Sequence, residues 1–222
     1  MTQDELKEQV AQAAVDFILP KLSQEMILGI GTGSTVDVFI DLLAKHRTRF
    51  AGAVSSSERS TARLLEHGIT VYDLNEVDVL EWYIDGADEI TAERAMTKGG
   101  GGALTREKIV ASVAKQFLCI VDESKQVEQL GAFPLPIEVL PLAQRSVTRH
   151  LQRFGGQVQL RPDFVTDNGG VILDVQGLRI ADPQSLEREI NDIPGVVCCG
   201  LFALQPATVA LVAGQKGVIT LS

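Results

Sequence analysis

The first half of the chain repeats one pattern, in which a short apolar run is followed by residues at helical spacing. Thr2 and Glu5 match a capping box, and the apolar positions that follow predict a helix as far as Ile18. Apolar runs predict strands at 26–30, 50–54, 69–72, 82–84 and 117–121, with helices after the first, second and fourth. Strands that alternate with helices indicate a parallel, doubly wound α/β sheet.

The pattern changes after Gly131, where Pro134 and Pro136 mark a junction. The order beyond it is strand, helix, strand, strand, helix, strand, predicted at 137–140, 142–154, 158–160, 171–175, 183–191 and 196–199. This order is the split βαβ, ferredoxin-like plan of a smaller α+β domain. A strand-like tail after Leu201 is expected to return to the first domain. We therefore predict a catalytic domain of residues 1–130 and 203–222 and a second domain of residues 131–202.

The composition and net charge of the chain exclude several classes of function. The 222 residues are 45% hydrophobic and 22% charged, which excludes disorder as the main state. The net charge of −9 makes the chain a poor binder of nucleic acid or anionic membranes. A phosphate group would therefore have to be bound by a few well-placed side chains and amides.

The cysteines and the N-terminus give expectations about metal sites and location. Cys119, Cys198 and Cys199 lie in apolar runs without CxxC or CxxH spacing, so neither a disulfide framework nor a metal site is predicted. The first residues lack the basic and apolar regions of a secretory signal. No apolar run reaches the roughly 18 residues that a membrane span needs. We expect a reduced, soluble, cytoplasmic protein.

The glycine-rich turn at 29–35 is the first candidate for a binding site. Its glycines alternate and no lysine follows, so it matches neither GxGxxG nor the phosphate-binding GxxxxGK[ST] loop. Backbone amides, the hydroxyls of Ser34 and Thr35 and a helix N-terminus nevertheless suit an anion. A tight turn with an ordinary hydroxyl N-cap explains the pattern equally well.

A second candidate follows the strand at 82–84. Residues 73–93 contain eight acidic residues and no lysine or arginine, and most of these acids are expected to be solvated surface charge. Asp85 and Asp88 differ because they come at the carboxyl end of a buried strand, where open α/β sheets bind ligands. Two carboxylates there could bind Mg²⁺, accept hydrogen bonds from sugar hydroxyls, or transfer protons.

Two lysine-containing segments complete the set of candidates. Lys98 precedes four glycines that lead directly into a helix, which allows a close approach of the backbone to a ligand. Glu107 lies in the early turns of that helix, and taken alone it is better explained by the helix dipole than as a base. Lys125 follows another strand end. Together these groups suit a phosphorylated, hydroxyl-rich metabolite.

The same segments resemble a known family, the ribose-5-phosphate isomerase A family. The resemblance runs along the whole chain and is carried by GIGTGST (29–35), VSSS (54–57), DLNEVD (73–78), DGADE (85–89), KGGGGALTREKI (98–109), DESKQV (122–127), FPLPIEV (133–139), VTDNGG (165–170) and IPGVV (193–197). It implies a Rossmann-like domain with an inserted ferredoxin-like domain. It also implies interconversion of ribose 5-phosphate and ribulose 5-phosphate through a cis-enediolate.

The resemblance further implies a role for each matching residue. Glu107 matches the general base, Asp85 and Asp88 the carboxylates that handle sugar hydroxyls and ring opening, and Lys98 the neutralising cation. The implied phosphate and substrate contacts are Lys7, Thr32, Gly33, Ser34, Thr35, Gly86, Ala87, Gly99, Gly100, Gly101 and Lys125. No metal or cofactor is implied, the partner is a small sugar phosphate, and a homodimer is expected.

Two other classes share this sheet architecture, so fold alone does not decide the function. CoA transferases use their glutamate as a nucleophile and need a large groove for CoA. Sugar-sensing domains of transcriptional regulators need a DNA-binding module, which the single helix before the first strand and the charge of −9 argue against. The KGGGGALTREK context and the length of 222 residues favour the isomerase.

Overall fold

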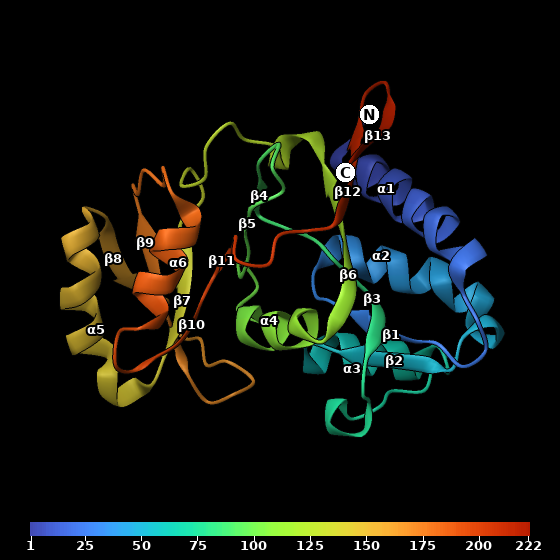
Figure 1. Ribbon diagram of the computed structural model, residues 1–222, viewed down its shortest axis with the longest axis horizontal. Coiled ribbons are helices and arrows are strands. Elements are labelled where there is room, and N and C mark those ends of the chain that lie inside the picture. The colour runs from blue at the N-terminus through green and yellow to red at the C-terminus, as the bar shows by residue number, and fades with distance from the viewer. The chain divides into compact units, whose positions relative to one another are not determined.

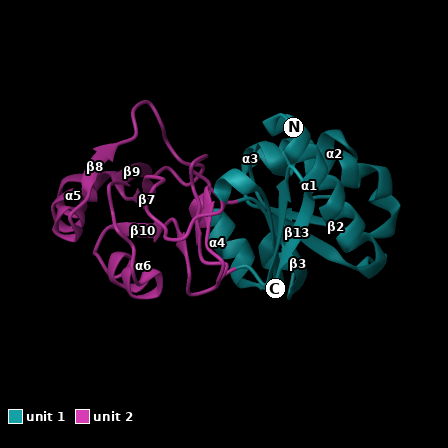
Figure 2. Cartoon of the chain, turned by 90° about the horizontal axis from the view of Figure 1, so that it is seen from above, with its two compact units in different colours: residues 1–86, 106–125, 207–222 teal, residues 87–105, 126–206 magenta.

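A computed structural model describes all 222 residues, which form two compact units (Figure 2). The first contains residues 1–86, 106–125 and 207–222, and the second contains residues 87–105 and 126–206. The chain therefore passes between the units four times. Three of these crossings fall inside the DGADE, ALTREK and DESKQV segments that the sequence analysis singled out.

The first unit is built on a six-stranded sheet. Its strands lie in the order β13 (Gly217–Leu221), β12 (Val209–Gly214), β6 (Ala114–Asp122), β3 (Leu80–Asp85), β1 (Ile27–Ile30) and β2 (Gly52–Ser55). All neighbours are parallel except β13, which pairs antiparallel with β12. This arrangement confirms the predicted doubly wound, Rossmann-like sheet, to which the tail of the chain contributes β12 and β13.

Helices cover both faces of this sheet (Figure 1). The helices are α1 (Gln3–Ile18), α2 (Ser34–Leu43), α3 (Glu58–Glu66) and α4 (Leu104–Ser112), and α1 and α2 lie on the face opposite α3 and α4. Short 3-10 helices lie at Leu19–Lys21, Ala44–Arg49, Leu74–Glu76 and Glu123–Lys125. The predicted capping box is present, with Glu5 N donating to Thr2 Oγ1 and Thr2 N to the Glu5 carboxylate.

The core of the first unit lies between α1, α2 and the sheet. Leu28, Ile30, Phe39, Ile84 and Leu118 are completely buried there. A sheet covered on both faces requires strands that are apolar on both sides, which explains why β1 is a nearly continuous apolar run. The predicted strand at 69–72 is reduced to a single bridge between Val71 and Ala53 beside β2.

The second unit contains a four-stranded antiparallel sheet. Its order is β10 (Val196–Cys199), β7 (Leu135–Val139), β9 (Val171–Gln176) and β8 (Gln157–Leu160), with helices α5 (Gln144–Leu151) and α6 (Pro183–Asn191). Short 3-10 helices at Pro141–Ala143 and Gln152–Phe154 extend α5 at both ends. Asp182 caps α6 and Pro183 occupies its first turn, as predicted. The ferredoxin-like plan is confirmed.

A small sheet that the sequence pattern did not indicate also belongs to the second unit. It consists of β11 (Leu201–Phe202), β5 (Met96–Thr97) and β4 (Glu89–Ile90). The buried carboxylate of Glu89 stabilises it by accepting hydrogen bonds from Thr97 Oγ1 and from two backbone amides, those of Gly131 and Phe133. This sheet fixes the backbone immediately before Lys98, whose own amide donates to the carbonyl of Gly200 at 2.8 Å.

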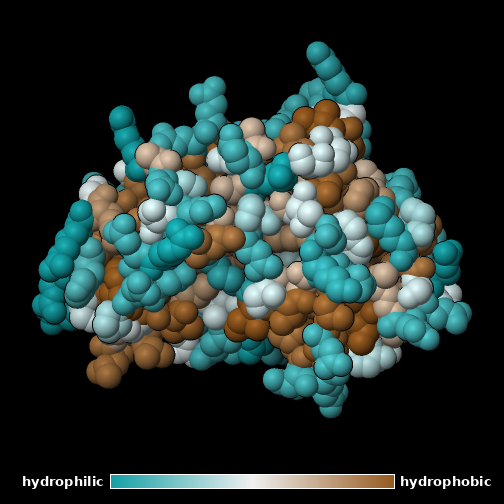
Figure 3. Space-filling view, viewed as in Figure 1, coloured by the Kyte–Doolittle hydropathy of each residue, from teal (hydrophilic) through white to brown (hydrophobic).

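Hydrophilic residues cover much of the surface seen in Figure 3, with apolar patches between them. The most exposed large apolar side chain is Leu142, at 98%, just before α5. None of the helices combines the length and the apolar character that crossing a membrane requires.

Candidate active site

Strand order brings several of the predicted site segments to one edge of the six-stranded sheet. The parallel strands β2, β1, β3 and β6 are neighbours, so the loops after them emerge side by side. The first helix after β1 is α2, and the first helix after β3 is α4, which lies on the other face. The carboxyl ends of β1 and β3 therefore form a topological switch point, the usual ligand-binding position in such sheets.

The turn after β1 leads directly into α2. Gly33 is the N-cap at φ 131°, a backbone conformation that favours glycine, and no side chain caps the helix. Ser34 and Thr35 are the first two residues of α2. The turn is therefore not an ordinary hydroxyl N-cap, and no side chain caps the first-turn amides of α2, which are the groups that bind anions at helix N-termini.

A cluster of hydroxyl groups supports this turn from the side of β2 and α3. Thr32 Oγ1 donates to Ser57 Oγ at 2.8 Å and lies 3.0 Å from Ser56 Oγ. Ser60 Oγ donates to the carbonyl of Gly31 at 2.8 Å. Ser57 is also the N-cap of α3, as its place before that helix predicts, whereas the contacts with the turn after β1 join segments more than 20 residues apart and were not predicted.

Asp85 is completely buried at the end of β3, and three groups fix its carboxylate. Oδ1 accepts from the amides of Thr32, at 3.0 Å, and Gly86, at 2.7 Å, while Oδ2 accepts from the hydroxyl of Tyr83 at 2.5 Å. Gly31 packs against this carboxylate so closely that a Cβ there would lie 1.9 Å from Asp85 Cγ. Asp85 thus ties the end of β3 to the turn after β1.

Glu107 lies in the first turn of α4 and is only 4% exposed. Its negative charge reaches Tyr83, whose pKa is raised well above 10, first by complete burial and then by the charges of Asp85 and Glu107. All three side chains are therefore largely closed to water, and Tyr83 is hydrogen-bonded to Asp85. Nothing in the alternation pattern of β3 distinguished Tyr83 from a core aromatic residue, so the sequence analysis missed it.

The second unit contains the other predicted catalytic residues, Asp88 and Lys98. Asp88 Oδ2 accepts from the amide of Gly100 at 2.8 Å, so the carboxylate is bound to the glycine segment that follows Lys98. Lys98 is 3% exposed, and its ammonium lies 5.4 Å from the centre of the Phe202 ring. A buried ammonium beside an apolar ring is suited to an anionic group that enters the site.

The two remaining predicted cations have different surroundings. Lys125 is half-buried in the 3-10 helix after β6, the strand that neighbours β3 in the sheet. Lys7 lies in α1, which packs against α2, and its ammonium pairs with Asp4 Oδ1 at 3.1 Å. The structure therefore places Lys125 after the carboxyl end of a strand of the six-stranded sheet, whereas the partner that it shows for Lys7 lies in the same helix.

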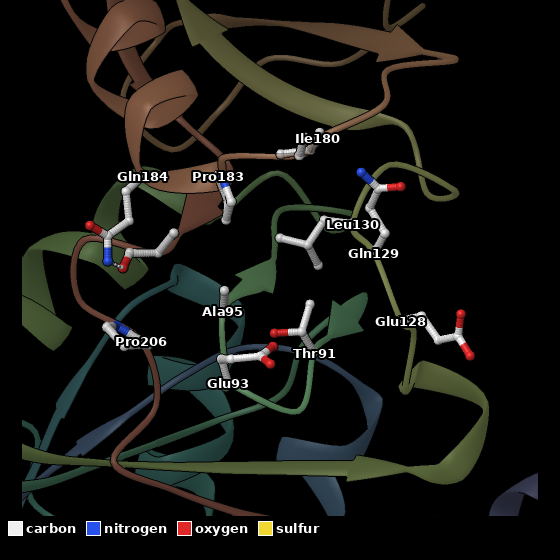
Figure 4. Close-up of a pocket in the computed structure, with 12 residues that line it drawn as sticks. Thr91, Glu93, Ala95, Glu128, Gln129, Leu130, Ile180, Pro183, Gln184 and Pro206 are labelled. Carbon is white, nitrogen blue, oxygen red and sulfur yellow. Dashed lines mark hydrogen bonds between the residues drawn. The ribbon is translucent and has the colours of Figure 1, made fainter.

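A cavity of about 520 Å³ in the second unit contains none of the predicted site residues (Figure 4). Apolar residues such as Leu130 and Ile180 line it together with Thr91, Glu93 and Glu128. Two carboxylates without a lysine, arginine or histidine in the lining are poorly suited to a phosphate. The strand ends, and not this cavity, match the chemistry predicted from the sequence.

Comparison with known proteins now decides the family. A family sequence model described as ribose 5-phosphate isomerase A (phosphoriboisomerase A) matches residues 52–217. The ribose-5-phosphate isomerase A of Bordetella bronchiseptica is 60% identical over 98% of this chain and 96% of that protein. This chain belongs to the ribose 5-phosphate isomerase A family.

Solved structures of ribose-5-phosphate isomerases have the same fold. The enzyme of Neisseria gonorrhoeae superposes with a TM-score of 0.94 at 45% identity, covering 99% of this chain and 97% of that one. A D-ribose-5-phosphate isomerase in complex with phospho-erythronic acid has a TM-score of 0.92 at 35% identity, with both chains fully covered. Both units of this chain therefore occur in ribose 5-phosphate isomerases.

Proposed function

We propose that this chain interconverts D-ribose 5-phosphate and D-ribulose 5-phosphate. The observation that carries the proposal is the 60% identity to a ribose-5-phosphate isomerase A along nearly the whole of both chains. The complex of a structural neighbour with phospho-erythronic acid supports a sugar phosphate as ligand. The strand-end edge, with its amide-rich turn and buried carboxylates, has the chemistry that such a ligand needs.

In the proposed mechanism Glu107 is the general base. It removes the proton from C2 of the open-chain aldose, and the electron pair of that bond forms the C1–C2 double bond of a cis-enediolate. Return of the proton to C1, with transfer of a proton between the two oxygens, gives the ketose. One carboxylate can serve both carbons because they are adjacent, and its burial in the first turn of α4 keeps water from competing.

Lys98 is proposed to neutralise the charge that develops on the sugar oxygens. Its nearly complete burial strengthens its interaction with an anion, since the local dielectric constant is low. Asp88, which is half-buried, is proposed to accept hydrogen bonds from sugar hydroxyls and to assist ring opening. Asp85 is proposed to share this role while holding the turn after β1 through its bond to Thr32.

The phosphate is proposed to bind at the N-terminus of α2. Ser34, Thr35 and the amides next to Gly33 would surround it, and Lys125 and Lys7 would supply positive charge. The phosphate does not react, so its binding energy can hold the open chain in position for proton transfer.

Solvent-exchange measurements on the protein and on Glu107→Gln test the proposal. The unaltered protein should form ribulose 5-phosphate and incorporate deuterium from D₂O into the sugar. Glu107→Gln keeps the shape of the side chain but cannot accept the proton, so kcat should fall by about 10²- to 10⁴-fold and deuterium incorporation should stop. The variant should still bind a phosphorylated sugar acid, which confirms that it is folded.

Other results would contradict specific parts of the proposal. Near-normal turnover by a folded Glu107→Gln protein would move the base to another carboxylate. No ketose formation by the unaltered protein would remove the isomerase function itself. The homodimer implied by the family remains a prediction, which light scattering tests by asking whether the mass is twice 24.0 kDa.

A further inference from the structure

The glycine segment after Lys98 is bound by an arginine whose position the proposed mechanism does not use. Arg161 follows β8, and its guanidinium forms a two-point ion pair with Asp174 of β9, with Nε–Oδ2 at 2.9 Å and Nη2–Oδ1 at 2.6 Å. The same guanidinium donates from Nη1 to the carbonyls of Gly100, at 3.0 Å, and Gly99, at 3.3 Å. Asp174 thus sets the plane of a fork that holds the glycine backbone.

Two further contacts bind the glycine segment and the start of α4 to other parts of the second unit. The ring of Phe164, which lies 5.3 Å from the Arg161 guanidinium, fills the space beside Gly102, where a Cβ would lie 2.2 Å from it. Thr105 donates its hydroxyl to the completely buried carboxylate of Glu138 in β7. The glycine segment is therefore fixed near its start, middle and end by side chains of the second unit.

One peptide group links Arg161 to a proposed catalytic residue. The carbonyl of Gly99 accepts from Arg161, and the N–H of the same peptide, which belongs to Gly100, donates to Asp88 Oδ2 at 2.8 Å. A peptide group is planar, so holding its oxygen also sets the direction of its N–H. A cation at the oxygen also polarises the group and strengthens the hydrogen bond that the N–H donates.

Glycines make this support necessary. Residues 99–102 have no side chains that could pack, and glycine loses more conformational freedom on folding than any other residue. Gly99 and Gly102 also have φ values of 104° and 81°, which other residues rarely adopt. A backbone that is free to approach a ligand therefore needs an external group to hold it in one conformation.

We propose that Arg161 is a positioning residue for the isomerisation, which orients the Gly99–Gly100 peptide and, through it, Asp88. This inference rests on the proposed function, because it gives Asp88 a role in handling the substrate. It assigns to the ferredoxin-like sheet a part in catalysis: the sheet holds, through the Arg161–Asp174 pair, the segment that connects Asp88 and Lys98.

The test is the activity of Arg161→Ala with and without added guanidinium ion. Removing the fork should lower kcat at least tenfold with a smaller change in KM, since the phosphate contacts are untouched. Guanidinium at millimolar, non-denaturing concentration should restore a measurable part of kcat by occupying the vacated position. The matched control, Arg153→Ala, removes an exposed arginine of the same unit and should change neither kcat nor the response to guanidinium.

Arg161→Lys keeps the test decisive if the alanine variant does not fold. Lysine retains the charge opposite Asp174 but cannot bridge two carbonyls in one plane, so kcat should still fall. Folded Arg161→Ala or Arg161→Lys with kcat within twofold of the unaltered protein would overturn the proposal. A lowered kcat of Arg161→Ala that guanidinium does not restore would also overturn it, because general destabilisation predicts that result.

Asp88→Asn separates this proposal from the proposed function. A lowered kcat in Asp88→Asn together with normal kcat in the Arg161 variants would overturn only the positioning role. Normal kcat in Asp88→Asn would instead remove Asp88 from the proposed mechanism, and the positioning role with it. Lowered kcat in Asp88→Asn and in both Arg161 variants, with rescue by guanidinium, is the result expected.

Discussion

The hydroxyl of Tyr83 couples the stability of the first unit to alkaline pH. Burial and the charges of Asp85 and Glu107 raise its pKa well above 10, so the folded protein keeps a proton that the unfolded chain releases above about pH 10. Stability is therefore fully present below that pH and falls as the pH rises toward the folded pKa. Above about pH 10 the free energy of unfolding should fall by about 1.4 kcal/mol per pH unit less in Tyr83→Phe than in the unaltered protein. Urea unfolding between pH 8 and about 11 measures this difference.

The comparison needs a second tyrosine variant. Tyr72→Phe removes the only other tyrosine of the chain and is the matched control. At neutral pH Tyr83→Phe should also lose about 1.5–3 kcal/mol, the usual contribution of a hydrogen bond to a charged group. An equal loss of alkaline dependence in Tyr72→Phe would contradict the assignment to Tyr83.

Replacing Lys125 tests whether this residue contributes to phosphate binding and not to the proton transfer. Its charge is proposed to contact only the phosphate, which is the same in substrate and transition state. Lys125→Ala should therefore raise KM by about 10- to 100-fold, the equivalent of one charged hydrogen bond, and leave kcat nearly unchanged. Lys115→Ala is the control, since Lys115 lies at the opposite end of β6 and pairs with Glu81 on the surface. A collapse of kcat at constant KM would show that Lys125 has been misassigned.

At the scale of elements, the turn between β1 and α2 depends on the glycine that begins it, Gly31. A Cβ at Gly31 would occupy the position of the Asp85 carboxylate, so Gly31→Ala must separate the ends of β1 and β3. We expect kcat/KM to fall by more than about 100-fold, because small displacements in a site have effects of this size. Stability should fall by about 1–3 kcal/mol in urea unfolding.

Gly68→Ala is the control for the glycine substitution itself. Gly68 follows α3 at φ 69°, and no atom lies within 4 Å of the position that a Cβ would take. Alanine there therefore costs about 1 kcal/mol of backbone strain and causes no clash. Its activity should be normal. If Gly31→Ala behaved in the same way, Asp85 would not be fixed by close packing against this turn.

The elements that the sequence predicted well are those with a local signal. Two adjacent residues, the N-cap Asp182 and the proline that follows it, specify the start of α6. The predicted bounds of that helix and of β10 agree with the structure. The strand at 69–72 was predicted from its apolar residues alone, but only Val71 forms a bridge, with Ala53 of β2 donating to the carbonyl of Thr70 and accepting from the amide of Tyr72. Local composition does not show whether a partner strand is available.

The parts of the site that could not be predicted depend on distant pairings. The strands β4, β5 and β11 are two residues long, too short for a period to be detected. From the sequence of β3, Tyr83 is indistinguishable from an aromatic residue of the core, because its hydrogen bond to Asp85 is visible only in the structure. Arg161 lies more than 60 residues from the glycines that it binds, and no spacing rule connects them. The motifs at strand ends, by contrast, were recognised because the end of a strand is visible in a few neighbouring residues, where an apolar run stops.

At the scale of the whole molecule, we expect activity without a metal. No group of three or more histidine, cysteine, aspartate or glutamate side chains is arranged to bind a metal ion. Treatment with EDTA followed by dialysis should therefore leave kcat unchanged, and adding Mg²⁺ or Zn²⁺ should not increase it. Loss on chelation with recovery on adding Mg²⁺ would recast Asp85 and Asp88 as ligands of a cation.

The route of the chain through the two units also sets the order in which the protein can assemble. β12 begins at Val209, 87 residues after β6 ends at Asp122 (209 − 122 = 87), yet the two strands pair along five residues. Closing so long a loop is slow, and until it closes the apolar strand β6 has an unpaired edge. During synthesis on the ribosome β6 therefore keeps this edge unpaired while residues 126–206, the larger part of the second unit, are made. A chain that ends before β12 would leave the edge of β6 unpaired and prone to aggregation. Chaperones and proteases are expected to act on such a fragment.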